Sequence, residues 1–302
     1  MRIQPQSPAL AATLLGQAAE FLAAHKNPAI SAYELAVLVF LRIKEPNTEL
    51  ATKAGFAQLC GNLLSIKLLT AIEPVSETRG YLLFGKTGAN PAEVLCSLDP
   101  FAFISHLSAM EYHGLTDRFP KILYITRPAA TQWRNYAQTR MAKDLGGRFQ
   151  AYLESGLPKL IQPKISRFGQ TAVHVCERSH MGAFRHISGS PLRVATIGRV
   201  FLEMIREPAQ CGGIQHVIDI YKREAQRYLN LIVDEINQHG LAIDKVRAGY
   251  LLSEVCKLNH PAITDWLKFA QRGGSRKLDP DGEYAPDFSD QWKLSLNVPS
   301  LI

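Results

Sequence analysis

The sequence lacks the cysteine pairs, leader segment and long apolar runs of secreted and membrane proteins. Its five cysteines lie at least 35 positions apart, which excludes a CxxC zinc knuckle or redox pair. This odd, scattered set predicts reduced thiols. Pro5, Pro8 and Glu20 interrupt the N-terminus, so no signal peptide is expected. The most apolar stretch, residues 35–43, is too short for a membrane helix, which needs about 20 residues. We therefore expect a cytoplasmic protein without membrane contact.

Common catalytic and metal-binding motifs are also missing. The chain has neither HExxH nor GxSxG. His106 and His113 are seven positions apart on a predicted helix, about 10 Å along its axis, too far to share a metal ion. His174 and Cys176 share one face of a predicted strand but have no further ligands nearby in the sequence. The sequence thus predicts no metal, no cofactor and no catalytic residue, and we expect a protein that is not an enzyme.

One segment matches a nucleotide-binding motif. Residues 80–87 fit the pattern GxxxxGK[ST] of phosphate-binding loops. Its middle residues, 81–84, are large and apolar, and a polar turn rather than a strand precedes them. This composition favours a strand at the edge of a hairpin. A nucleotide-binding enzyme is therefore the least favoured hypothesis for this chain.

Composition and charge describe a globular chain with a basic N-terminal part. The 302 residues are 46% hydrophobic and 20% charged, which is typical of a globular protein, and this length favours two domains. The net charge of +7 lies wholly before residue 190, because residues 191–302 hold 14 basic and 14 acidic residues. Such an excess of basic residues suits a polyanionic partner. The basic segment 118–185 could bind nucleic acid, dock an acidic partner or simply face solvent.

Residues 1–88 have the pattern of a winged helix-turn-helix. Helices are predicted over residues 10–25 and from Ser31, where Ser31 and Glu34 have the spacing of a capping box. A third helix carries an apolar stripe of Phe56, Leu59, Cys60, Leu63 and Leu64, with Ala54-Gly55 as the expected turn before it. Extended segments at 68–74 and 81–84, around a polar turn at 75–80, predict a hairpin.

The face of this third helix opposite the apolar stripe suits contact with bases. Gln58, Asn62 and Ser65 lie there, and Gln and Asn side chains can form paired hydrogen bonds to adenine. Phosphate contacts are expected from basic residues at the helix ends and in the hairpin, namely Lys53, Lys67, Arg79 and Lys86. The sequence therefore predicts a site for double-stranded DNA. A solvated helix face, or a winged helix that binds protein, is the alternative.

Residues 89–302 are predicted to form a second, larger domain after a linker at residues 86–91. A helix over 105–114 and strands at 121–126 and 171–176 give a mixed α/β part, residues 89–190. Residues 191–302 read as mainly helical, with helices containing Ile197–Ile205 and Ile214–Ile232, further helices at 244–258 and 261–270, and a last strand at 292–298. The predicted fold class is α+β: an N-terminal winged helix-turn-helix and a larger mixed α/β, mostly helical C-terminal domain.

Several short motifs in this second domain resemble the AbiEi family of antitoxins. Residues 105–115 (SHLSAMEYHGL) are similar to its "S-LSA---HGL" element, and residues 195–203 to its "AT-ERTLLD" helix. Residues 208–214 and 247–252 (RAGYLL) are similar to its "P---GG" turn and "RLGYLL" helix. Gly198 and Glu203 depart from the family pattern, which usually has Glu and Asp there.

The resemblance implies an antitoxin that represses its own operon by binding operator DNA through a winged helix. It also implies that the C-terminal domain counteracts a nucleotidyltransferase-like toxin, directly or indirectly, in phage defence or in keeping mobile elements. The alternative is an interaction module that binds protein and not DNA.

Overall fold

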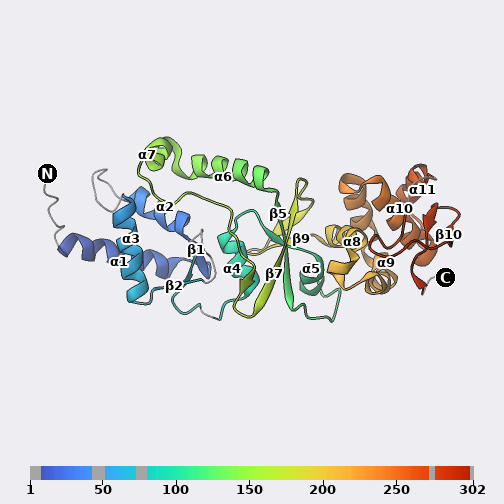
Figure 1. Ribbon diagram of the computed structural model, residues 1–302, viewed down its shortest axis with the longest axis horizontal. Coiled ribbons are helices and arrows are strands. Elements are labelled where there is room, and N and C mark those ends of the chain that lie inside the picture. The colour runs from blue at the N-terminus through green and yellow to red at the C-terminus, as the bar shows by residue number, and fades with distance from the viewer. Residues whose placement is uncertain (1–7, 43–51, 73–79, 87, 272–275, 300–302) are drawn as a thin grey trace.

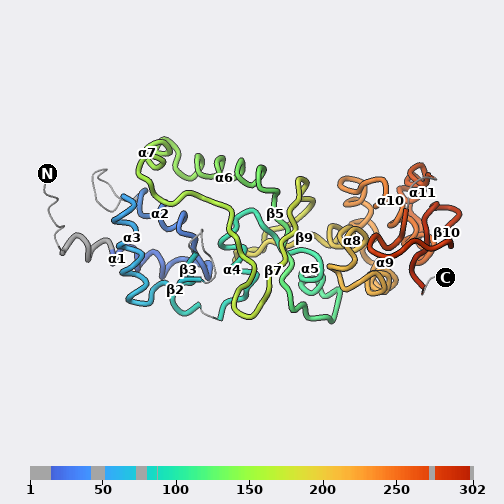
Figure 2. The backbone as a smooth tube through the Cα atoms, viewed as in Figure 1, coloured from blue at the N-terminus to red at the C-terminus, as the bar shows by residue number. Residues whose placement is uncertain are grey.

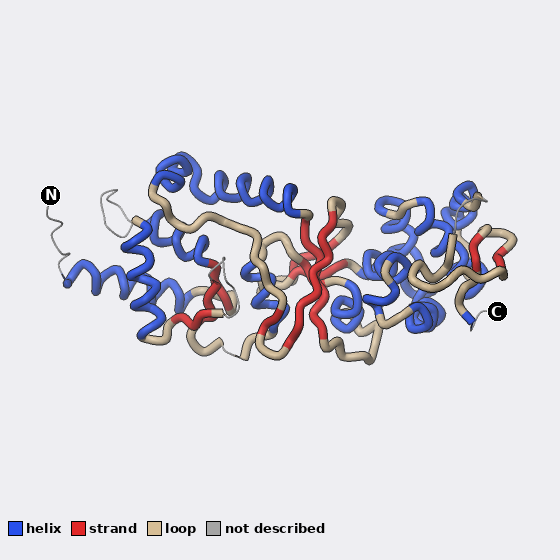
Figure 3. The backbone as a smooth tube through the Cα atoms, in the orientation of Figure 1, coloured by secondary structure: helices blue, strands red, loops and turns tan. Residues whose placement is uncertain are grey.

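The computed structural model describes residues 8–42, 52–72, 80–86, 88–271 and 276–299. The molecule is elongated, with helices at both ends and a six-stranded sheet between them (Figures 1 and 3). It is thus a mixed α/β chain, as expected. In these described parts, no helix has the length and apolar character needed to cross a membrane.

The N-terminal end contains three helices and a small antiparallel sheet. The helices are α1 (Pro8–Ala24), α2 (Ala32–Arg42) and α3 (Lys53–Ser65). The strands β1 (Ala29–Ser31), β2 (Leu69–Ala71) and β3 (Gly80–Leu83) pair in the order β1-β3-β2. The predicted helices and the two hairpin strands are confirmed, while the predicted turn at 75–80 lies largely outside the described residues.

Local hydrogen bonds determine where α2 and α3 begin. The capping box is confirmed, since the Glu34 amide donates to Ser31 Oγ (3.1 Å) and the Ser31 amide donates to Glu34 Oε2 (3.3 Å). The predicted turn at Ala54-Gly55 is wrong. Thr52 caps α3 by accepting a hydrogen bond from the Gly55 amide (3.2 Å), so both residues lie within the first turn of the helix.

A short helix follows the expected linker. Helix α4 (Pro91–Leu98) begins at Pro91, with the Asn90 side chain accepting a hydrogen bond from the Ala92 amide (2.9 Å). Proline suits the first helical position because its missing amide proton would have no partner there. This helix was not predicted, and it covers one side of the central sheet (Figure 1).

The central sheet has the strand order β6-β7-β5-β4-β9-β8. The strands are β4 (Phe103–Ile104), β5 (Ile122–Pro128), β6 (Arg167–Phe168), β7 (Thr171–Arg178), β8 (Phe184–His186) and β9 (Arg193–Ala195). The pairs β5–β7 and β4–β9 are parallel and the other pairs antiparallel. Helix α5 (His106–Tyr112) packs on the side opposite α4 (Figure 1). The two predicted strands and the helix before Gly114 are confirmed.

Two helices of the middle region return to the N-terminal end. Helix α6 (Ala130–Leu145) and helix α7 (Phe149–Glu154) leave the sheet, and the chain then runs back to it (Figure 2). Their buried Trp133 and Tyr152 belong to the same hydrophobic cluster as Phe40 of α2 and Leu59 of α3. The core of the N-terminal end is therefore completed by residues beyond 88. The domain boundary at 88 stays a prediction.

The C-terminal end is helical, as predicted. Helices α8 (Ile197–Arg206), α9 (Ile214–His239), α10 (Ala242–Tyr250) and α11 (Pro261–Trp266) pack with the sheet in a second hydrophobic cluster. The helix expected at 244–258 ends as an α-helix at Tyr250 and continues as a π-helical turn, Leu251–Val255.

The strand predicted at 292–298 is largely wrong. Only Leu294–Ser295 (β11) is extended, and it pairs with β10 (Phe288–Ser289). Lys293 has φ +50°, which interrupts an extended backbone. Trp292 is fully buried and packs at Gly249 of α10, where a Cβ atom would lie within 2.6 Å of the indole ring. The alternating pattern there reflects the burial of single side chains rather than a strand.

Candidate functional sites

No described residue buries the polar face of α3. Phe56, Leu59, Cys60 and Leu63 point into the N-terminal core, as predicted. The side chains of Gln58, Asn62 and Ser65 are exposed on the other face. The Ser65 hydroxyl donates to the Asn62 carbonyl oxygen (2.8 Å), so it offers a partner only its acceptor lone pairs. One helix face thus presents amide groups to solvent.

The predicted basic residues lie at different places around this face. Lys53 begins α3 and Lys67 follows its last turn, and both are exposed. Lys53 also lines an apolar groove of about 370 Å³ between α3 and the segment 156–163, where Lys159 lies. Lys86 is exposed in a separate polar hollow with Lys26. Arg79 lies outside the described residues. The structure therefore brings Lys53 and Lys67 to α3 but places Lys86 in another hollow.

The segment with the nucleotide-binding pattern is a strand, as the sequence analysis favoured. Residues Tyr81–Leu83 lie in β3 with buried side chains and pair with β1 and β2. A phosphate-binding loop exposes backbone amides to the phosphates, whereas these amides lie in a paired central strand. Residues 80–83 of the motif therefore do not form a phosphate-binding loop.

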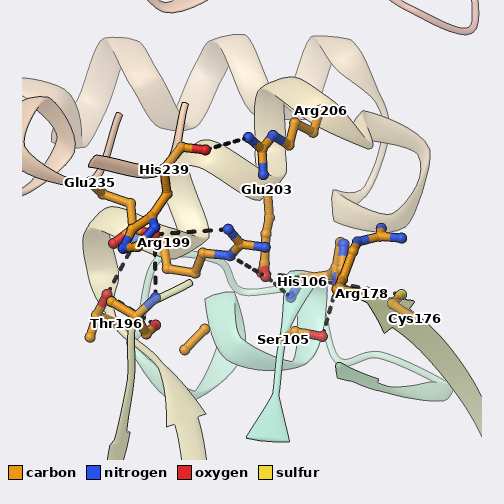
Figure 4. Close-up of polar contacts among 12 residues, drawn as sticks. Ser105, His106, Cys176, Arg178, Thr196, Arg199, Glu203, Arg206, Glu235 and His239 are labelled. Carbon is orange, nitrogen blue, oxygen red and sulfur yellow. Dashed lines mark hydrogen bonds and ion pairs between the residues drawn. The ribbon is translucent and has the colours of Figure 1, made fainter. Parts of the chain in front are cut away.

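A second site, which the sequence analysis missed, is a buried polar cluster between the central sheet and α8. We call it the His106 cluster; it consists of the buried residues His106, Cys176, Arg199 and Glu203 and, at its partly exposed outer edge, Arg178 and Glu207. Figure 4 labels all of these residues except Glu207. The residues come from α5, β7, α8 and the residue after α8. His106 is 70 positions from Cys176 and 101 from Glu207, so no local spacing could have revealed the group.

Histidine 106 is the centre of this cluster. Its Nε2 lies 2.7 Å from Glu207 Oε2, its Nδ1 lies 2.9 Å from Ser105 Oγ, and the Cys176 sulfur is 3.9 Å from Nδ1. Its backbone amide donates to Glu203 Oε2 (2.8 Å), and its φ of +50° is one that side-chain-bearing residues rarely adopt. This conformation costs about 1–2 kcal/mol, which the surrounding contacts must offset.

The two carboxylates are held by arginines from both sides. Arg199 donates from Nε to Glu203 Oε1 (3.0 Å), and both side chains are at most 3% exposed. Arg178 donates a hydrogen bond to Glu207 at the outer edge of the cluster, where both side chains are about one-third exposed. The charges therefore alternate from Arg199 to Arg178 through the cluster, which is how buried ions are tolerated.

These pairings control the protonation of the cluster. Burial lowers the pKa of His106, but Glu203, Cys176 and Glu207 outweigh it and raise that pKa to about 10. Burial raises the pKa of Glu207, yet the hydrogen bonds from His106 and Arg178 bring it down to about 2. In the protein without any bound ion, the imidazole is therefore a cation between two carboxylates at neutral pH.

Two further polar groups lie beside Cys176. The thiol donates to Gln210 Oε1 (3.0 Å). Thr126 is the register partner of Cys176 in the parallel pair β5–β7, so its side chain lies on the same sheet face. It is fully buried, and its Oγ1 has no hydrogen-bond partner among the described residues.

In comparisons with known proteins, this chain matches no family model and no curated sequence.

Proposed function

We propose that this protein is a DNA-binding regulator that reads base pairs through the exposed polar face of α3. The single observation that carries the proposal is that Gln58 and Asn62 lie exposed on one face of a helix whose other face is buried. The element order α1-β1-α2-α3-β2-β3, with an antiparallel sheet, supports a winged helix-turn-helix over residues 1–88. In that architecture α3 is the recognition helix and β2–β3 the wing.

The spacing on α3 suits adjacent base pairs. Gln58 and Asn62 are four positions apart, which separates them by about 6 Å along the helix axis. Base pairs are spaced by about 3.4 Å, so the two amides would reach base edges one or two steps apart. Lys53 and Lys67 at the ends of α3 would contact the flanking phosphates, and Lys159, which lines the same groove as Lys53, would extend that contact.

The DNA-binding test uses a duplex from upstream of the gene and a scrambled duplex of equal length. The parent protein should bind the upstream duplex more tightly, with an affinity that falls steeply as salt rises. Asn62→Ala should lose about 1–3 kcal/mol of discrimination between the two duplexes. Lys67→Ala should instead weaken binding to both duplexes and reduce the salt slope by about one.

A matched control is the exposed Asn230 of α9, far from α3 in the sequence. Asn230→Ala should bind both duplexes as the parent does. If the parent shows no salt-dependent binding, or Asn62→Ala discriminates as well as Asn230→Ala, α3 is not the reading helix.

The resemblance to AbiEi antitoxins extends this proposal to an operon that encodes a toxin. We propose that the protein represses its own operon and that residues 89–302 counteract a nucleotidyltransferase-like toxin. A fragment of residues 89–302 is unsuited to testing this, because Trp133 and Tyr152 would lose the N-terminal core against which they pack. Full-length Asn62→Ala, co-expressed with the neighbouring gene, should still rescue growth while repression is lost. Loss of rescue together with repression would contradict separate functions.

A second candidate function is a module that binds protein. Around the α5–β5 connection, Phe119 is 84% exposed, and Tyr112 and Ile122 are also exposed. A contiguous exposed apolar patch is typical of a partner contact, and this candidate requires that the three side chains form one. If the protein binds no DNA, Phe119→Ser should abolish a complex with the neighbouring gene's product. A complex that survives Phe119→Ser would exclude this surface.

A further inference from the structure

The geometry points to a zinc-type metal site in the His106 cluster, with the imidazole of His106, the thiolate of Cys176 and the carboxylate of Glu207 as ligands. One ligand atom from each residue lies within 4.8 Å of the other two. This inference goes beyond the proposed DNA binding and does not depend on it.

The donor set fits zinc in chemistry and in size. Sulfur, imidazole nitrogen and carboxylate oxygen are the three donor types that zinc prefers in proteins. Bonds of about 2.0–2.3 Å in a tetrahedral site separate the ligand atoms by about 3.3–3.7 Å. The Cys176 sulfur is already 3.9 Å from His106 Nδ1. Glu207 Oε2 lies 2.7 Å from the other ring nitrogen, Nε2, so the imidazole and the Cys176 and Glu207 side chains must rotate to bring one His106 nitrogen, the sulfur and the oxygen to binding distance.

Neighbouring groups can complete and support the site. The amide oxygen of Gln210 is 3.0 Å from the Cys176 sulfur, and this oxygen or a water can take the fourth position. Glu203 Oε2 accepts a hydrogen bond from the His106 backbone amide (2.8 Å). Glu203 would therefore orient the ligand His106 without itself contacting the metal ion. Thr126 lies beside Cys176 on the same sheet face. It is fully buried, and its Oγ1 has no hydrogen-bond partner among the described residues.

The burial pattern suits an ion better than an organic substrate. Cys176 is 3% exposed and His106 is 1% exposed, so a substrate could not reach the thiol. Glu207 and Arg178 are 29% and 32% exposed and form the outer edge of the cluster. A metal ion entering there would take the place of Arg178 on Glu207, and the guanidinium would turn into solvent. On metal binding, the Cys176 thiol would lose its proton and the His106 imidazolium would lose one of its two ring protons, and both protons would pass to the solvent.

The test uses the full-length protein after treatment with a chelator, titrated with Co²⁺ as a spectroscopic probe. The parent should bind one ion per chain with a thiolate-to-cobalt charge-transfer band, and Zn²⁺ should bleach this band. Cys176→Ser should lose the band, whereas the control Cys256→Ser, a half-buried thiol at the end of the π-helical turn, should keep it. Glu207→Gln should keep the band but weaken Co²⁺ binding by more than the about 10-fold to 100-fold that loss of a partner outside the coordination sphere costs.

A thermal measurement gives an independent readout. Zn²⁺ should raise the melting temperature of the parent and of Cys256→Ser, since a ligand that binds only the folded state stabilises it. It should not raise that of Cys176→Ser. The proposal is overturned if the parent shows no charge-transfer band, or if the band survives in Cys176→Ser. Should Cys176→Ser fail to fold, unchanged Co²⁺ affinity in Glu207→Gln overturns it equally.

Discussion

Replacing Glu203 by alanine should destabilise the protein more than any surface change. The carboxylate is 1% exposed and accepts hydrogen bonds from the His106 amide (2.8 Å) and from Arg199 Nε (3.0 Å). Glu203→Ala leaves a buried guanidinium whose remaining carboxylate, Glu235, is 3.9 Å away. Removing one partner of a buried ion pair costs about 3–5 kcal/mol. The orphaned amide adds to this cost, so we expect about 4 kcal/mol or more.

The assay is urea unfolding followed by far-UV circular dichroism at neutral pH, with a chelator present. Glu203→Gln should cost less than Glu203→Ala, because the amide keeps the side-chain volume and one acceptor oxygen. In the Arg199→Met background, Glu203→Ala should cost less than in the parent, since the guanidinium it would orphan is gone. Glu154→Ala, at an exposed position of α7, is the control and should stay within about 0.5 kcal/mol of the parent. A similarly small effect for Glu203→Ala would refute the ion-pair reasoning.

Three further predictions concern packing and pH. Gly249→Ala should destabilise folding by about 1–3 kcal/mol in urea unfolding, because its Cβ would overlap the Trp292 ring. Gly61→Ala, at an open position of α3, should instead stabilise it by about 0.5–1 kcal/mol, and equal effects of the two would contradict this packing. The lowered pKa of Glu207 means that its contribution to stability is complete above pH 4.5 and is lost as pH falls through about 2. The raised pKa of His106 has the opposite sign: its contribution is complete below pH 6.5 and is lost as pH rises through about 10. Thermal unfolding of metal-free protein across both pH ranges checks these signs. For His106, the difference in stability between the parent and His106→Gln should shrink from pH 7 to 10. A difference that stays constant over this range would contradict the raised pKa of His106.

Periodicity predicted the N-terminal end well because its elements depend on local patterns. The stripe from Phe56 to Leu64 has the helical period, and Ser31 with Glu34 has the capping-box spacing, so both helices follow from residues close in sequence. Within the described residues, the turn at Ala54-Gly55 was misplaced and the strand β1 (Ala29–Ser31) was not predicted. The Thr52 cap, and not the glycine, decides where α3 starts.

Isolated small residues and single buried side chains misled the prediction elsewhere. The alternation at 292–298 suggested a strand, but the Trp292 side chain is buried against α10, where Gly249 has no side chain to exclude it. The polar, basic composition of residues 130–145 concealed helix α6, whose narrow buried face includes Trp133 and Met141. That face becomes visible only once the N-terminal core against which it packs is known.

The sequence alone determined which side of α3 is apolar and which is polar, since a period of 3.6 residues separates Phe56 from Asn62 on any helix. It also determined the helical character of the C-terminal end. The tertiary structure decided where α6 and α7 pack, and it brought His106, Cys176 and Glu207 together. Contacts across 70 or 101 positions arise from strand order and helix packing, which no local spacing encodes.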